Sequence, residues 1–166
     1  MHPQVIDKTA DSTLYHFGDN NLEEWQGLFQ HYVTPPLLEA VNRGSLSFGL
    51  GGAGSGVPFH THGAVFAEVL HGRKVCTFTF TFFGKRASLT FSLSLQRWFL
   101  YPGEQVPTYN PNETSLRWLL FSYPALSEEQ LPVECTLQVG EVLYLPGGWH
   151  HATLNIGESV FMSTFV

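Results

Sequence analysis

Charged side chains are scarce in this chain of 166 residues. Lys, Arg, Asp and Glu make up 13% of it, which is about half of their usual share in globular proteins. The formal net charge is −6. This charge argues against a nucleic acid or an anionic membrane as the main partner, because both are bound through basic surfaces.

Cysteine and long apolar runs are scarce as well. Cys76 and Cys135 could pair with each other, but two cysteines are too few for a disulfide framework, and they form no CxxC motif. No stretch reaches the roughly 18–20 apolar residues of a membrane-spanning helix. Met1-His2-Pro3 has neither the basic start nor the apolar run of a signal peptide, so the chain as written is expected to stay in the cytosol.

Aromatic residues are abundant, and they favour β-strands. The length fits one domain over residues 1–166, and the glycine-rich stretch that ends at Gly56 is interpreted as a flexible hinge. Sequence patterns predict strands at 12–17, 133–138, 141–145, 149–154 and 158–165, and helices at 22–29 and 113–122. Short strands with regular turns predict an all-β sandwich or barrel with short flanking helices.

Histidines at two places in the chain form a candidate metal site. On a strand, residues two apart point to the same side, so His60 and His62 can both reach one ion. Further along, Trp149 and His151 share a face, and His150 points to the opposite one. Three imidazoles suit zinc or iron equally well, so the spacing predicts a metal site at His60, His62 and His151 without naming the metal.

Long stretches around these histidines cover nearly the whole chain except residues 75–96. They are FGDNN (17–21), GAGSGVPFHTHG (52–63), GRK (72–74), RWFLYP (97–102), YPALS (123–127), ECTLQVGEVLYLPGGWHHATLN (134–155) and SVFMSTF (159–165). In these stretches the sequence resembles the JmjC-domain family of the cupin superfamily. The resemblance implies a double-stranded β-helix, or jelly roll.

The resemblance also implies roles for individual residues. Enzymes of this family bind Fe(II) through a His-x-Asp/Glu pair and a distant histidine, and this leaves coordination positions for 2-oxoglutarate and oxygen. His60 matches the first ligand and His151 the last. Lys74 matches the lysine that pairs with the far carboxylate of 2-oxoglutarate.

His62 departs from this pattern, because it stands where the family enzymes have Asp or Glu. A carboxylate offsets the charge of the ion, and a neutral imidazole does not. Glu68 is an alternative third ligand if the alternation that starts at His60 continues through Gly63. The departure favours a non-catalytic or weakly catalytic metal-binding jelly roll that acts through protein partners. The alternative is an Fe(II)- and 2-oxoglutarate-dependent protein hydroxylase.

The resemblance further implies a protein of the endoplasmic reticulum lumen whose N-terminal part is missing here, as in a truncated isoform. In that compartment the sequon Asn112-Glu113-Thr114 would carry a glycan on Asn112. The residues alone do not indicate an oligomeric state or a substrate.

Residues 75–96 interrupt the match, because GRK runs directly into RWFLYP as one strand in the resembling family. One interpretation is a translated retained intron of 66 bases (22 × 3). Valine codons begin with GT, Gln96 can be encoded by CAG, and residues 88–95 have pyrimidine-rich codons. The other interpretation is a natural β-hairpin, because 75–83 and 89–96 are both strand-like and GKRA lies between them.

Overall fold

A computed structural model describes residues 14–18, 21–39, 45–73, 75–82, 85–92, 96–105, 107–110 and 112–166. Lys74, to which the family resemblance assigns the cosubstrate, lies outside the described residues.

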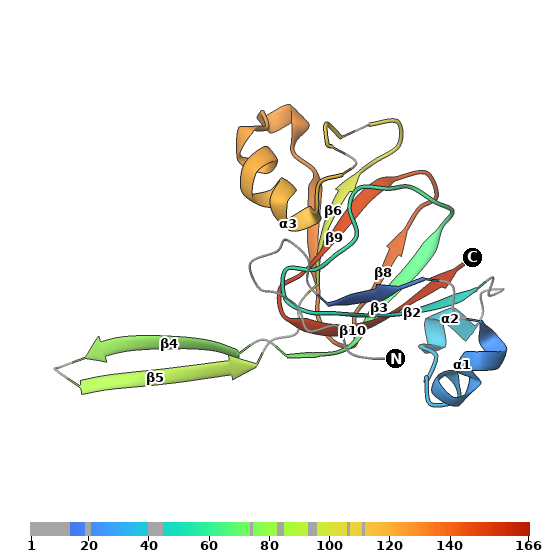
Figure 1. Ribbon diagram of the computed structural model, residues 1–166, viewed down its shortest axis with the longest axis horizontal. Helices are drawn as coiled ribbons and strands as arrows, with labels where there is room; N and C mark the ends of the chain where they lie inside the picture. Colours follow the sequence, from blue (N-terminus) through green and yellow to red (C-terminus); the bar gives the residue numbers. More distant parts are fainter. Residues whose placement is uncertain are drawn as a thin grey trace.

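Two antiparallel sheets form the body of the molecule (Figure 1). The five-stranded sheet has the order β1 (Tyr15–Phe17), β2 (Leu46–Gly51), β10 (Glu158–Phe165), β3 (Val65–Arg73) and β8 (Val142–Leu145). The three-stranded sheet has the order β7 (Val133–Leu137), β6 (Gln96–Tyr101) and β9 (His150–Asn155). Two sheets that enclose one core are the arrangement of a jelly roll, so the predicted all-β, double-stranded β-helix fold is confirmed.

The core between the sheets is apolar at its centre. On β3, Val65, Ala67 and Val69 point inward in alternation and are buried. Their partners come from the opposing sheet and from β8: Trp98, Leu100, Leu137 and Leu145. Each larger aliphatic side chain that is buried in this way contributes about 1.5–3 kcal/mol. The period-two pattern of these strands therefore determines which face of each sheet is inside.

Glycine allows one aromatic ring to lie flat across the five-stranded sheet. A Cβ atom at Gly49 would lie 2.2 Å from the ring of Phe161, which faces Gly49 across the β2–β10 pairing. Tyr15 and Phe17 of β1 then approach the same ring, with centroid distances of 6.3 Å and 5.6 Å. These contacts attach the short edge strand β1 to the sheet.

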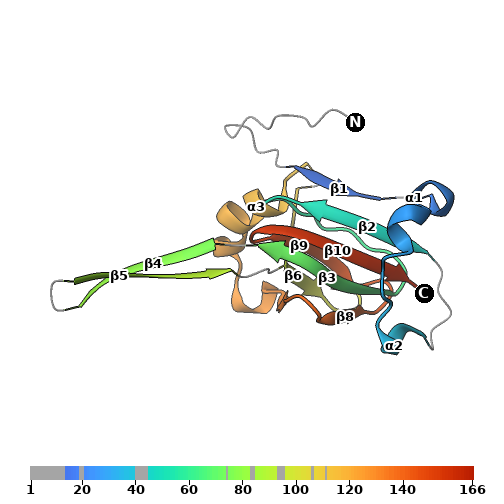
Figure 2. The ribbon, with the colours of Figure 1, turned by 90° about the horizontal axis from the view of Figure 1, so that it is seen from below.

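Two helices lie at one end of the five-stranded sheet (Figure 2). The α1 helix (Leu22–Phe29) begins after Asn21, whose side chain accepts a hydrogen bond from the Glu23 amide. Trp25 packs against Phe48 of β2. The short α2 helix (Pro36–Glu39) begins at Pro36, because proline fits the first turn of a helix, where no backbone N–H is needed.

A helical segment covers the outer face of the three-stranded sheet. It starts with α3 (Ser115–Arg117), which Thr114 caps, and continues through η1 (Trp118–Ser122), η2 (Tyr123–Ala125) and η3 (Glu128–Gln130). Trp118 is buried against Phe59 and Phe99. The predicted helix at 113–122 is therefore confirmed, with a π-helical second half.

A hairpin of β4 (Val75–Phe82) and β5 (Lys85–Ser92) projects from this body (Figures 1 and 2). Its strands pair along their whole length, from Val75 opposite Ser92 to Phe82 opposite Lys85. The predicted hairpin is confirmed, although β5 already begins within the expected turn. The hairpin connects β3 of one sheet to β6 of the other, so it lies at a crossover between the two sheets.

Candidate metal centre

The backbone places His60 directly opposite His151. The two residues form an antiparallel bridge in which each amide donates to the carbonyl of the other, at 3.1 Å and 2.9 Å. Residues bonded in this way direct their side chains to the same side. The pairing continues at His62, whose carbonyl accepts from the Gly148 amide at 2.9 Å. His62 therefore shares the face of His60 and His151.

The three imidazoles form one cluster. Their ring centroids are separated by 4.1 Å (His60–His151), 4.6 Å (His62–His151) and 5.2 Å (His60–His62). One ligand atom from each ring lies within 4.8 Å of the other two. Side-chain rotation would bring all three nitrogens onto a single ion with bonds of about 2.1 Å. The structure therefore brings together the three predicted ligands.

Each ring is held by a hydrogen bond to the main chain at its Nδ1 atom. His60 bonds to the carbonyl of Pro58 at 2.8 Å, His62 to that of Gly63 at 2.7 Å and His151 to that of Trp149 at 3.0 Å. A carbonyl oxygen only accepts, so Nδ1 must carry the proton in all three rings. The lone pair of each neutral ring is then on Nε2, which is the state of a metal-ligating histidine with an outer-shell partner.

Burial keeps two of the rings neutral. It lowers the pKa of His151 from 6.5 to about 3, and the neighbouring His60 adds to this effect. Burial also lowers the pKa of His60, and His62 contributes in the same direction. Because metal binding requires the unprotonated ring, His60 and His151 are ready to act as ligands at neutral pH.

Apolar rings form two walls of the site. Trp98 of β6 stacks on His151 with a centroid distance of 5.8 Å, and Phe165 of β10 lies 5.1 Å from His62. His151 is 1% exposed, whereas His60 and His62 are half-buried. The cluster therefore faces solvent on the side of His60 and His62.

A buried polar network continues from the site into the barrel. Trp98 donates to Gln96, which in turn donates to Asn155 at 3.0 Å. Asn155 also bonds to Ser55 and Ser159, at 3.0 Å and 2.6 Å. Gln96 and Asn155 are almost completely buried, and their mutual bonds satisfy them. No sequence pattern indicated this network, because its members lie far apart in the chain.

Glu68 does not belong to the cluster, so the alternative third ligand is wrong. β3 begins only at Val65, after a loop through Gly63, and the alternation of His60 and His62 is lost there. Glu68 lies on the outer face of the sheet, opposite to Ala67 and Val69. There its carboxylate accepts a hydrogen bond from Tyr32 at 2.9 Å, and burial raises the pKa of Glu68.

The strand that carries His151 has the predicted alternation. Trp149 packs on the inner core, and His150 points to the other face with its Nδ1 atom buried and without a hydrogen-bond partner. Of these two adjacent histidines, His151 is therefore the one that lies in the cluster, as the resemblance implied.

The stretch before His60 is a segment packed against β9 rather than the predicted flexible hinge. Its backbone bonds to β9, with the amides of Thr153 and Asn155 donating to the carbonyls of Val57 and Ser55 at 3.0 Å and 2.7 Å. A Cβ atom at Gly56 would lie 1.9 Å from the Thr153 carbonyl oxygen. Glycine is needed there because the two backbones nearly touch, and this contact leads His60 to its place beside His151.

Two other sequence candidates lie outside the cluster. Asn112 is exposed in the loop before α3. Cys135 on β7 is a free thiol, and burial raises its pKa. The side chain of Cys76, its candidate partner, lies outside the part of the chain that the structure describes.

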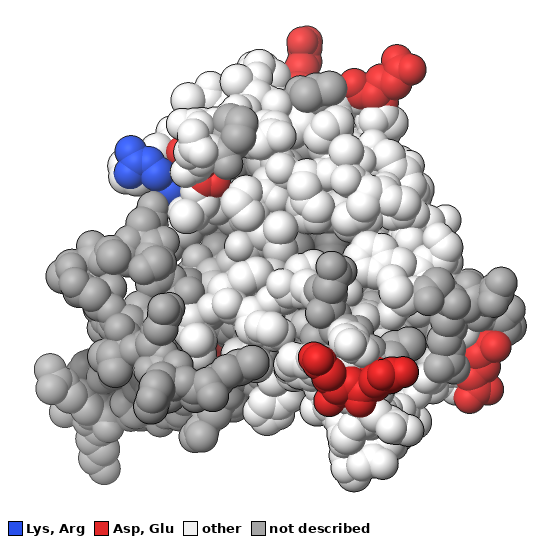
Figure 3. Space-filling view, turned by 45° about the vertical axis from the view of Figure 1, so that its right-hand side comes forward, with Lys and Arg blue, Asp and Glu red and all other residues white. Residues whose placement is uncertain are grey.

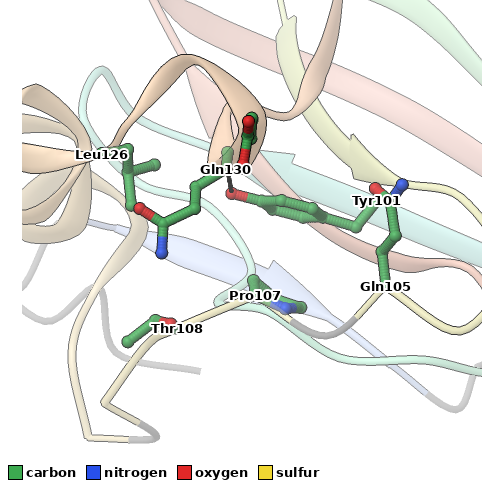
Figure 4. A pocket seen from close by; sticks show the side chains of 7 residues that line it. Tyr101, Gln105, Pro107, Thr108, Leu126 and Gln130 are labelled. Atoms are coloured by element: carbon green, nitrogen blue, oxygen red, sulfur yellow. Dashed lines mark hydrogen bonds between the residues drawn. The ribbon is translucent and has the colours of Figure 1, made fainter.

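A separate hollow of about 260 Å³ lies on the outer side of the three-stranded sheet. Its lining residues come from the end of β6, the loop after it and the segment around η3: Tyr101, Gln105, Pro107, Thr108, Leu126, Glu129 and Gln130. Tyr101 points across it and donates to the Gln130 carbonyl at 2.8 Å (Figure 4). Tyr101 packs with Phe59 on the face opposite to Trp98, so this hollow lies apart from the histidines.

The surface carries few charges. On the face in Figure 3 most of the described surface is uncharged, with basic side chains in one small area and acidic side chains in separate places. Among the described residues, no helix is both long and apolar enough to cross a membrane.

Comparisons with known proteins point to one group. No family model matches the chain. JmjC domain-containing protein 8 from Rattus norvegicus is 48% identical over 166 residues, which are 100% of this chain and 54% of the relative. The protein of that name from Homo sapiens is 47% identical over the same shares. The 2-oxoglutarate and iron-dependent oxygenase JMJD4 from Gallus gallus is 25% identical over 119 residues, 67% of this chain and 24% of the relative.

Among solved structures, YcfD, a ribosomal oxygenase from Escherichia coli in complex with cobalt and succinic acid, has a TM-score of 0.46 at 18% identity and covers 87% of this chain and 28% of that one. The chain spans about half of the length of the first two relatives. From its similarity to the first two relatives along its whole length, we conclude that the chain belongs to the JmjC-domain proteins.

Proposed function

We propose that this chain is a metal-binding jelly roll that holds a divalent ion through Nε2 of His60, His62 and His151. The observation that supports this most strongly is the set of three hydrogen bonds from Nδ1 to main-chain carbonyls, which leaves every Nε2 lone pair free. Metal-ligating histidines commonly donate the N–H of their other ring nitrogen to a carbonyl or carboxylate in this way.

Fe(II) is the ion that we propose, with 2-oxoglutarate as the cosubstrate. The name of the relative JMJD4 supports both. Fe(II) with 2-oxoglutarate supplies oxidative chemistry at C–H bonds when both are bound. The chain would contribute three neutral ligands, an apolar wall at Trp98 and Phe165, and Lys74 as the partner of the distant carboxylate.

We further propose that turnover is weak or absent and that the domain acts through protein partners. His62 supports this proposal, because the site has no carboxylate ligand. Gln96 supports it too. It heads β6, is buried and bonds to Asn155, whereas in the resembling family the lysine matched by Lys74 directly precedes the residue matched by Arg97.

The location that fits these proposals is the lumen of the endoplasmic reticulum, with a glycan on the exposed Asn112. We also propose that residues 75–96 of this isoform derive from a retained intron. Genomic DNA that lacks GT…AG boundaries around the segment would exclude that origin.

The second candidate function is an Fe(II)- and 2-oxoglutarate-dependent protein hydroxylase. The placement of His60 and His151 favours it, because these two residues match the outer ligands of the family's enzymes.

One experiment tests the proposed function against this alternative. The full chain is incubated with Fe(II) under anaerobic conditions, its metal content is measured, and succinate release from 2-oxoglutarate is then followed in air. We expect about one ion per chain, lost in His60→Ala and retained in the exposed-site control His71→Ala, with little succinate. Succinate release that depends on His60 would support the hydroxylase. An absence of bound metal would contradict both functions.

A further inference from the structure

The ligand set of the candidate site carries no charge of its own. Its three described members are imidazoles, and the group contains no carboxylate. Glu68, the acidic residue that follows the histidine pair most closely, faces the other side of the sheet and bonds to Tyr32. The net charge of a divalent ion and its three ligands would therefore be +2. With an aspartate at position 62 this net charge would be +1.

The surroundings strengthen the effect of that charge. His151 is 1% exposed, and Trp98 and Phe165 close two sides with aromatic rings. Electrostatic attraction is several times stronger in such surroundings than in water. Three protein ligands would also leave at least one coordination position of the ion open. The half-buried rings of His60 and His62 leave the cluster accessible to small solutes.

On the basis of the proposed metal binding, we propose that the loaded site takes up a small monovalent anion directly on the ion, and that the neutral side chain of His62 determines its affinity. The anion is of the class of a carboxylate, an azide or a halide. It would neutralise part of the charge that a carboxylate ligand offsets in the family's enzymes. His62 would thus set the charge selectivity of the open position in addition to holding the metal.

Cobalt(II) gives a direct readout, because its visible absorption responds to each change in coordination. The full chain is loaded with Co(II), its content is measured, and the spectrum is followed during titration with sodium azide at constant ionic strength. We expect a saturable spectral change for the wild-type chain. For His62→Asp we expect Co(II) to remain bound and the azide affinity to fall at least tenfold.

Two further variants separate charge from other effects. His71→Asp makes the same substitution at an exposed position of β3, and we expect it to leave the azide affinity unchanged. His62→Glu provides a second charged variant if His62→Asp does not fold. The inference is overturned if Co(II) binds and azide does not change the spectrum, or if the charged variants bind azide as tightly as the wild type. If the wild-type chain binds no Co(II), the proposed function is overturned together with it.

Discussion

At the scale of single residues, main-chain carbonyls hold the three histidine rings of the candidate site. Pro58, Gly63 and Trp149 each offer a carbonyl to the Nδ1 atom of a histidine. Every residue type has a main-chain carbonyl that can accept such a bond, so no sequence motif could have indicated it. The histidines themselves could be predicted, because their spacing and the resemblance both pointed to them.

The buried state of His151 makes the stability of the metal-free chain depend on pH. Its pKa is about 3 in the folded state and about 6.5 when unfolded. Between these values the unfolded chain binds the additional proton, so stability is lost as the pH falls below about 6.5. For this group the loss at pH 5 is on the order of 2 kcal/mol.

Urea denaturation at pH 7.5 and pH 5 in the presence of a chelator measures this difference. We expect the difference to shrink in His151→Gln and to persist in His31→Gln, because His31 is exposed. An equal loss in wild type and His151→Gln would show that His151 is not responsible.

Gly56 is a second residue whose role depends on a backbone contact. In Gly56→Ala the new methyl group would meet the Thr153 carbonyl, and the segment that contains Gly56 would have to move away from β9. We expect a loss of at least about 3 kcal/mol in the free energy of unfolding, together with weaker metal binding, since His60 follows on the same segment. Chemical denaturation and metal titration would show both effects.

Gly27→Ala is the matched control, because Gly27 lies in α1 with open space around it. Alanine favours the helix by up to about 1 kcal/mol there, so we expect a small gain in stability. A similar small change for Gly56→Ala would contradict the close contact.

At the scale of secondary-structure elements, the hairpin of β4 and β5 stands in the sequence between Lys74, the proposed partner of 2-oxoglutarate, and β6. It ends at Ser92, and β6 then begins with Gln96, which points inward toward Asn155. If residues 75–96 were absent, Lys74 would directly precede Arg97 and would take the register position of Gln96. The hairpin could be predicted from its alternating pattern. The position of the hairpin between two different sheets could not be predicted, because it depends on how strands that are distant in the sequence pair.

Deletion of Val75–Gln96 should therefore increase the affinity for 2-oxoglutarate. The change places a cationic side chain opposite Asn155, where the wild-type chain has a neutral amide. We expect at least a tenfold gain in affinity, measured by calorimetry on the chain loaded with a redox-inert divalent ion. The same deletion combined with Lys74→Gln is the control. Equal affinities in these two deletion variants would show that the lysine is not the cause.

At the scale of the whole molecule, the two sheets and the helical segment divide the surface into regions with different roles. His151 lies beside Trp98 on the inner face of the three-stranded sheet. The helical segment covers the outer face of that sheet (Figure 1). Tyr123 and Arg97 both bond to Glu134 and thereby tie this segment to the sheet. The fold class followed from strand patterns and the resemblance. The loss of alternation between His62 and Glu68 could not be predicted from the sequence, because side chains in the loop between them do not alternate regularly.

This division predicts that glycosylation leaves the metal site unaffected. Asn112 is exposed in the loop that precedes α3, and the polar bulk of a glycan would extend into solvent there. When the full chain is directed into a secretory compartment, we expect one glycan, detected by mass spectrometry and absent in Asn112→Gln. Thr114→Ser should retain it, because serine preserves both the sequon and the hydroxyl that caps α3 through the Arg117 amide. Both variants should bind Co(II) as the wild type does; a weaker affinity in Asn112→Gln would mean that this loop and the histidines are coupled through the sheet between them.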